Sequence, residues 1–233
     1  MLWYKSWLET RYKLFVMFVL MGVMMGLQYS AVRSPIQAGA RPGGLGLVAV
    51  FSMLSFLSFI IMAGAGIATQ TLLATKGLHG SMQYTLTLPV SRFRMLIVRS
   101  GMGWLEAVAG ISVLCCVMWL LFPEWHAMGT PLEMTKYVAT LIACTSAIYS
   151  LSVLFATFLH DQARAYSSML ITVLLFWLSL HEHLPVAVDL FRAMGKGSPL
   201  IAHTMPWTPM IISMVLSVVF FLAALQVARR REY

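Results

Sequence analysis

Long apolar runs separated by short polar segments are the dominant pattern of this chain. Six runs are apolar enough to cross a membrane, at 14–32, 45–73, 95–122, 137–159, 165–180 and 208–227. A helix of about 20 apolar residues crosses the hydrocarbon core of a bilayer, and it satisfies its own backbone hydrogen bonds there. The pattern therefore predicts an all-α polytopic membrane protein, with six transmembrane helices in a single domain over 1–233.

Composition and charge agree with this class. Hydrophobic residues make up 60% of the chain and charged residues only 10%, a balance that excludes an ordinary soluble domain. The formal net charge of +8 could indicate nucleic-acid binding. The basic residues, however, lie beside the ends of apolar runs, as in membrane proteins. We therefore expect a lipid bilayer, and no nucleic acid, as a partner.

The distribution of lysine and arginine predicts the orientation. Cytoplasmic loops carry the excess of these residues. Six spans with both ends inside place eleven of them on the inner side, against Arg33, Arg41, Lys136, Arg192 and Lys196 on the outer side. This bias predicts a protein of the cell membrane, inner or plasma, with both termini cytoplasmic.

The N-terminal segment 1–13 has helical spacing of apolar residues on one side and charged residues on another. Trp3 and Trp7 suit the membrane interface, so the segment is predicted to be an amphipathic helix lying in the inner headgroup layer. A plain basic flank remains the alternative. The run 14–32 is longer than the core of a usual signal peptide, and Arg33 separates it from the small residues that could form a cleavage site. We expect an uncleaved first span.

The longest polar interruption on the inner side is the segment 77–94. Gly77 and Gly80 can stop the preceding helix, Ser81 can cap a new one, and Pro89 prevents that turn from continuing into the next span. Its apolar residues would then face something other than water; they are Met82, Tyr84, Leu86 and Leu88. A short cytoplasmic helix with an apolar face suits contact with a soluble partner. The alternative is a basic loop that lies on the inner side because of its positive charge and has no further role.

This segment resembles the coupling-helix region of type-2 ATP-binding-cassette (ABC) exporter permeases. The run 80–92 reads Gly-Ser-Met-Gln-Tyr-Thr-Leu-Thr-Leu-Pro-Val-Ser-Arg. The family has Gly-Ser/Thr-x-x-Tyr/Phe-x-Leu-x-Leu-Pro-Val-Ser-Arg before its third span. The resemblance implies that the contact with the ATPase is made by Ser81, Met82, Tyr84, Leu86, Leu88 and Arg92. It also implies an N-terminal elbow helix and an external re-entrant segment between the fifth and sixth spans.

The resemblance further implies an ATP-driven transport subunit, not an enzyme. The sequence has no Gly-x-x-x-x-Gly-Lys-Ser/Thr motif to cradle ATP phosphates. The ATPase, with its ATP and Mg²⁺, would therefore be a separate chain, and no cofactor or metal is expected on this one. A second permease copy or paralogue would complete a homodimer or heterodimer.

Within the predicted third span, Glu106 is the only acid. A carboxylate within a membrane is costly and is by default a candidate functional group. Because Arg99 lies about two turns earlier, a structural pair is the alternative. A stripe of small residues in the second span, which includes Ser55, Ser58 and Gly66, is expected to serve close helix packing more than a substrate path.

Two other features of the sequence are candidates for chemistry. His181, Glu182 and His183 could form the site of an intramembrane metalloenzyme, but two His separated by one residue point away from each other on a helix, so an interfacial polar cap is favoured. A scaffold subunit without a transport role is a third interpretation. The cysteines at 115, 116 and 144 lie in predicted spans and are interpreted as small apolar residues.

The charge bias predicts that Ser81 is cytoplasmic. In intact cells, a Ser81→Cys variant in a cysteine-free background should be labelled only by a membrane-permeant thiol reagent. Strong labelling by an impermeant reagent would contradict the predicted orientation.

Overall fold

The computed structural model describes residues 54–67, 92–121, 129–159, 161–181 and 184–230, with isolated positions between 15 and 26. In this part of the chain every regular element is a helix, and no strand occurs. The all-α prediction is confirmed for these residues. Three of the described helices are long and apolar enough to cross a membrane, at Leu96–Leu120, Pro131–Thr157 and Trp207–Arg230.

The helices follow the predicted order of apolar runs. A helix at Leu54–Ile67 comes first, and the remaining labelled elements are α4 (Arg92–Leu121), α6 (Pro131–Phe158), α7 (Asp161–Leu180), α8 (Leu190–Met194), α9 (Pro199–Ala202) and α10 (Trp207–Arg230). The predicted runs 95–122 and 208–227 match α4 and α10 to within three residues at each end. The elbow segment 1–13 lies outside the described residues.

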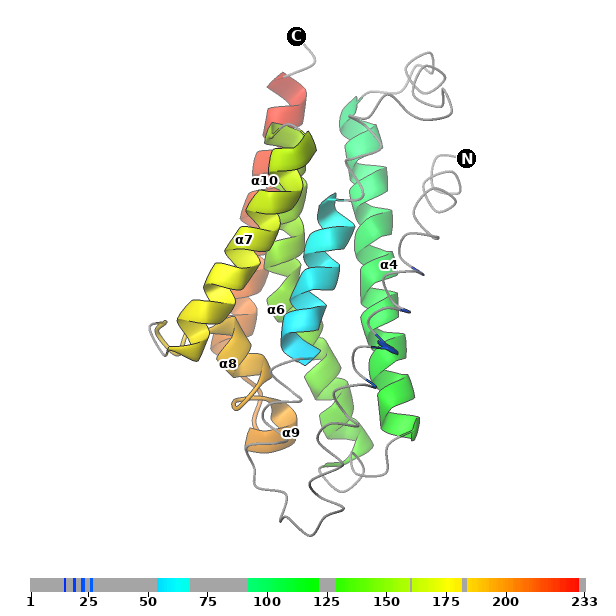
Figure 1. The fold of residues 1–233 in the computed structure, drawn as a ribbon, viewed down its shortest axis with the longest axis vertical. Coiled ribbons are helices and arrows are strands. Elements are labelled where there is room, and N and C mark those ends of the chain that lie inside the picture. The colour runs from blue at the N-terminus through cyan, green and yellow to red at the C-terminus, as the bar shows by residue number, and fades with distance from the viewer. Residues whose placement is uncertain are drawn as a thin grey trace.

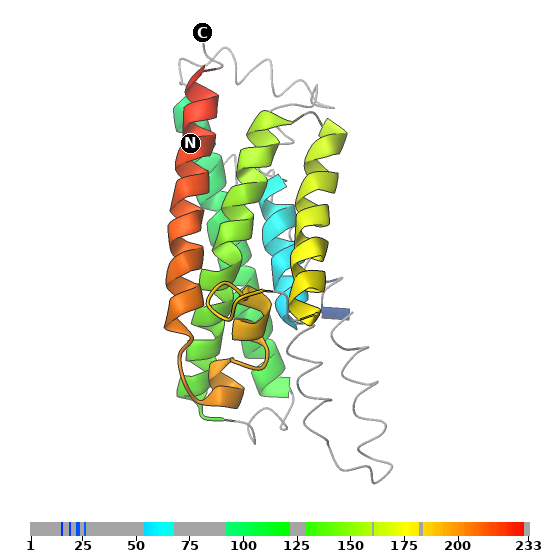
Figure 2. The ribbon, with the colours of Figure 1, turned by 90° about the vertical axis from the view of Figure 1, so that its left-hand side faces the viewer.

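The long helices stand side by side in one bundle (Figures 1 and 2). The beginning of α4, the α6–α7 junction and the end of α10 lie together at one end, which we call the basic end because Arg94, Arg229 and Arg230 are exposed there. The short helices α8 and α9 lie at the opposite end (Figure 2). From α4 to α6 to α7 the chain thus runs back and forth between the two ends of the bundle, as the predicted spans require.

Helix α6 is the central element of the bundle. Two thirds of its apolar window is buried inside the chain, against 17% for α10, and its most extensive contact is with α10. The two helices run in the same direction. Their hydrogen-bonded partners keep an almost constant separation in sequence: Thr140 with Met210 and Ser213 with Cys144 are 70 and 69 residues apart. A constant separation is the signature of parallel helices in register.

Serine hydroxyls fasten this parallel pair. Ser213 Oγ donates to the carbonyl of Cys144 at 2.9 Å. One turn later, Ser217 Oγ lies 3.1 Å from the carbonyl of Ser146 and 2.8 Å from Ser150 Oγ. Small polar residues allow close helix approach and supply hydrogen bonds in an apolar environment.

The fourth helix begins earlier than the sequence pattern predicts. The run 123–136 was expected to be an external loop, but α6 begins at Pro131. Thr130 caps the helix in a reciprocal capping box with Glu133, and proline occupies the first turn, where its missing N–H costs nothing. Apolar patterning misses this turn because Glu133 and Lys136 interrupt the apolar residues there. In the same way, α7 begins at Asp161, before the predicted start at 165.

Two contacts set the position of α8, one with α7 and one with the 54–67 helix. Asp189 caps α8 by accepting from the backbone N–H of Arg192 at 2.9 Å, and the same carboxylate oxygen accepts from Ser179 Oγ of α7 at 2.7 Å. Phe191 of α8 stacks on Phe59 of the 54–67 helix, with ring centroids 4.2 Å apart. The segment between α7 and α10 is thus folded back onto the bundle.

The 54–67 helix packs closely on α6 through small residues. Ser55 and Ser58 are fully buried, and a Cβ atom added at Gly66 would lie 2.7 Å from both Ser152 Cβ and the carbonyl oxygen of Tyr149. These described members of the small-residue stripe therefore serve helix packing, as expected.

We expect Gly66→Ala to destabilise the bundle by about 1–3 kcal/mol, because a methyl group there meets backbone of α6 that cannot move aside. Gly26→Ala is the matched control, since a Cβ at that position meets nothing within 4 Å. Thermal unfolding in detergent, followed by circular dichroism, should show a lower midpoint for the first variant only. Equal midpoints would show that the contact is not a constraint.

Candidate functional site

Of the residues predicted to contact an ATPase, the structure describes the backbone of Arg92. Ser81, Met82, Tyr84, Leu86 and Leu88 are outside the described residues. Arg92, the last residue of the run, is the first residue of α4. The run therefore leads directly into one of the three helices that are long enough to cross a membrane.

The start of α4 is joined to the end of α10. The guanidinium carbon of Arg229 lies 4.7 Å from the centre of the Phe93 ring, a distance at which a cation is attracted to the face of an aromatic ring. Phe93 directly follows the run 80–92. A displacement of that run would therefore act on two helices, α4 and α10. Sequence analysis missed this contact because its partners are far apart along the chain.

Glu106 lies on the face of α4 that is turned into the bundle. Its relative exposure is 7%, and Ala107 and Ile111 beside it are fully buried, whereas Leu105 is half exposed. A membrane-spanning helix would turn the Leu105 side to lipid and the Glu106 side to protein. This is the usual placement of an ionisable residue within a membrane.

Arg99 shares this buried face. Its exposure is 8%, and seven residues of α-helix place it almost directly above Glu106, about 10 Å away along the axis. Two opposite charges buried on one helix face are compatible with a structural role and with a functional one. Both interpretations from the sequence stay open for Glu106.

Two hydrogen bonds attach this face of α4 to α6. The hydroxyl of Tyr149 donates to the carbonyl of Ser100 at 2.6 Å, and the indole N–H of Trp104 donates to Ser146 Oγ at 3.2 Å. Buried tyrosine and tryptophan normally find a partner for their polar atom. That rule could have indicated that Tyr149 and Trp104 form hydrogen bonds inside the bundle, but the sequence alone does not reveal their partners.

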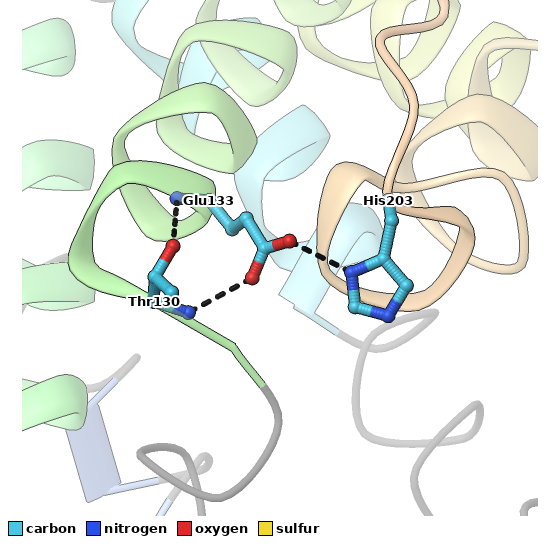
Figure 3. A network of polar contacts seen from close by, with 3 residues as sticks. All are labelled: Thr130, Glu133 and His203. Atoms are coloured by element: carbon cyan, nitrogen blue, oxygen red, sulfur yellow. Dashed lines mark hydrogen bonds and ion pairs between the residues drawn. The ribbon is translucent and has the colours of Figure 1, made fainter.

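The opposite end of the bundle has a polar network of its own (Figure 3). One oxygen of Glu133 accepts from the backbone N–H of Thr130 at 2.8 Å, and its other oxygen lies 2.7 Å from His203 Nδ1. His203 has a left-handed backbone, with φ of 54°, and it precedes α10. The pair is partly exposed to solvent, so it positions the chain between α9 and α10 with little net stabilisation.

Of the three residues weighed as a metal site, the structure describes His181. Its Nδ1 atom lies 2.9 Å from the carbonyl oxygen of Trp177, and its ring packs on the indole with centroids 4.5 Å apart. Glu182 and His183 lie outside the described residues. Among the residues that are described, no group of three or more His, Cys, Asp or Glu side chains could hold a metal ion.

The three cysteines are all free thiols. Cys115 and Cys144 belong to the buried core, and Cys116 is exposed on α4. Each therefore acts as a small apolar side chain, as the sequence predicts.

Comparison with protein-family models finds no match, and comparisons with curated proteins and with solved structures find no significant match.

We expect Tyr149→Phe to destabilise the chain by about 1 kcal/mol, because it removes the hydroxyl that ties α6 to the carbonyl of Ser100. Thermal unfolding of the purified protein in detergent would measure the loss. Trp177→Phe is a suitable control, because Trp177 is half exposed on the outside of α7. A Tyr149→Phe variant as stable as the wild type would show that the hydrogen bond contributes nothing to the attachment of α4.

Proposed function

We propose that this chain is the membrane-spanning permease subunit of an ABC exporter. It moves a substrate across the membrane with energy from ATP hydrolysed on a separate ATPase subunit, and it works with a second permease copy or paralogue. The observation that carries the proposal is the run 80–92, which has the residue pattern of a coupling helix and ends at the first residue of α4.

The arrangement of helix ends supports this proposal. The helix α4 begins at the basic end, beside the end of α10, where Arg229 lies over Phe93 (Figure 1). The α6–α7 junction lies at the same end (Figure 1). A force applied there would reach α4 and α10 directly, and α6 through the serine contacts with α10.

The proposal includes the full topology. Six spans cross the inner or plasma membrane, the basic end is cytoplasmic, and the segment 1–13 forms an elbow helix in the inner headgroup layer. The segment that contains α8 and α9 enters the outer side of the membrane as a re-entrant element. Its short helices, joined by a Gly-Lys-Gly break, are of a kind that membranes tolerate where protein covers the backbone.

Glu106 has a place in this proposal as an intramembrane acid on the inward face of α4. As a functional group it would act within this chain's own bundle, because it is only 7% exposed there. It can also hold α4 in place through its charge. Measuring transport by a Glu106→Gln variant of unchanged stability separates the two roles.

Tyr84 provides the sharpest test of the proposal. Replacing it with Asp puts an unpaired charge into the predicted contact and should weaken assembly with the ATPase by about 2 kcal/mol or more. Insertion into the membrane should be unchanged, because the predicted site lies outside the lipid. Co-purification with the candidate ATPase, together with transport-coupled ATP turnover, measures both effects.

Trp125→Asp is the matched control for this experiment, since it makes the same type of change in the predicted external loop. It should leave assembly and turnover as in the wild type. A Tyr84→Asp variant that binds and stimulates the ATPase normally would remove the main support for the exporter assignment. The enzyme and scaffold interpretations predict no effect of either variant on any ATPase.

A further inference from the structure

Four phenylalanine rings join the 54–67 helix, α7 and α8. Phe59 of the 54–67 helix stacks on Phe191 of α8, with ring centroids 4.2 Å apart and an angle of 22° between the ring planes. Phe176 of α7 meets Phe191 edge-on at 5.2 Å and lies 4.6 Å from Phe56. Stacked and edge-on arrangements are attractive for aromatic rings. The pair Phe59 and Phe191 is therefore a direct link between the 54–67 helix and α8.

Packing holds the helix α8 in place. It has five residues, too few for a helix to be stable by itself. Three of them are buried, Phe191, Ala193 and Met194, and Phe191 has the largest side chain of the three. Its ring contacts both the 54–67 helix and α7. A displacement of Phe59 would therefore be passed to α8.

Nearer the basic end, the 54–67 helix is held against α6. A Cβ atom added at Gly66 would lie 2.7 Å from Ser152 Cβ and from the carbonyl oxygen of Tyr149. Ser152 belongs to the second half of α6, which leads to the basic end (Figure 1). Seven residues of α-helix separate Phe59 from Gly66, so both project from nearly the same side, about 10 Å apart along the axis. The 54–67 helix thus connects a close contact with α6 to an aromatic contact with α8.

We propose that the 54–67 helix couples the two ends of the bundle, because a displacement at Gly66 moves α8 through the stacked rings of Phe59 and Phe191. Protein interiors are packed closely enough to transmit strain from one element to the next. The coupling requires only the described contacts. In the exporter proposed above, the run 80–92 follows this helix in sequence, and the ATPase would act on α8 by this route.

The reactivity of a buried thiol on α8 measures the coupling. The reporter is Ala193→Cys in the full-length chain, in a cysteine-free background and in nanodiscs. Because Ala193 is 5% exposed, this thiol reacts with a water-soluble maleimide only when α8 moves. The perturbation is Gly66→Ala, which acts on the 54–67 helix two turns away from the stacked rings. The measured quantity is the rate of labelling.

We expect Gly66→Ala to raise the labelling rate of the α8 reporter about fivefold, a size typical of coupled sites. Gly26→Ala should leave the rate unchanged, since a Cβ there meets nothing within 4 Å. In a Phe59→Leu or Phe191→Leu background, Gly66→Ala should change the rate less than about twofold, because the link is broken. Phe56→Leu should preserve the response, because Phe56 contacts α7.

A second reporter, Ala147→Cys, separates coupling from general loosening of the bundle. Ala147 is also 5% exposed, but it lies on α6. Its labelling rate should not respond to Gly66→Ala, because the 54–67 helix is proposed to move α8 and not α6.

Three results would overturn the proposal. Gly66→Ala could leave the α8 reporter as slow as in the parent protein. The response could persist in both Phe59→Leu and Phe191→Leu, which would exclude the stacked rings as the link. The two reporters could respond equally, which would reduce the effect to a loss of stability. Failure of the exporter proposal would appear separately, in the Tyr84→Asp experiment, because the labelling test uses no ATPase.

Discussion

The parallel packing of α6 against α10 is the constraint on which the rest of the described bundle depends. Ser213 and Ser217 lie one turn apart on α10 and reach the backbone or hydroxyl groups of α6. In an apolar bundle these hydroxyls have few other partners, so their hydrogen bonds select one register between the helices. The contact of His203 with Glu133, also 70 residues apart, continues that register to the opposite end.

Parallel packing of two helices requires a return path for the chain. The helix α7 supplies it by running back along the bundle, and α8 and α9 then occupy the end at which α10 must begin (Figures 1 and 2). Asp189 holds this arrangement, because one carboxylate oxygen both caps α8 and accepts from Ser179 of α7. The helices α8 and α9 therefore lie at this end of the bundle because they lead the chain to the start of α10, which lies beside the start of α6.

Several hydroxyls inside the bundle are satisfied by backbone carbonyls of their own helix or of a neighbouring one. Hydroxyls along α6 donate to carbonyls of the preceding turn, as Thr145 does to Leu141 and Ser146 to Ile142. Hydroxyls that point to another helix bind the two helices together, as the hydroxyl of Tyr149 does by donating to the carbonyl of Ser100 on α4. Among the described residues, the buried charged side chains are Arg99, Glu106 and Asp189, and the first two share one face of α4.

Much of the fold could be predicted from the sequence by itself. Apolar runs located α4 and α10 to within three residues, because a helix that crosses a bilayer must be predominantly apolar along its length. The small residues Ser55, Ser58 and Gly66 indicated close packing, and Gly66 does lie against α6. The start of α6 was predicted too late because Glu133 and Lys136 interrupt the apolar pattern of its first turns, although the Thr130–Glu133 capping box can be recognised in the sequence. Only the tertiary structure decided which helices are neighbours: α6 beside α10, Tyr149 on Ser100 and Arg229 on Phe93. The physical reason is that apolar helices can exchange places in a bundle at little cost in burial, whereas a hydrogen bond or a cation over a ring needs one particular partner within a few ångströms.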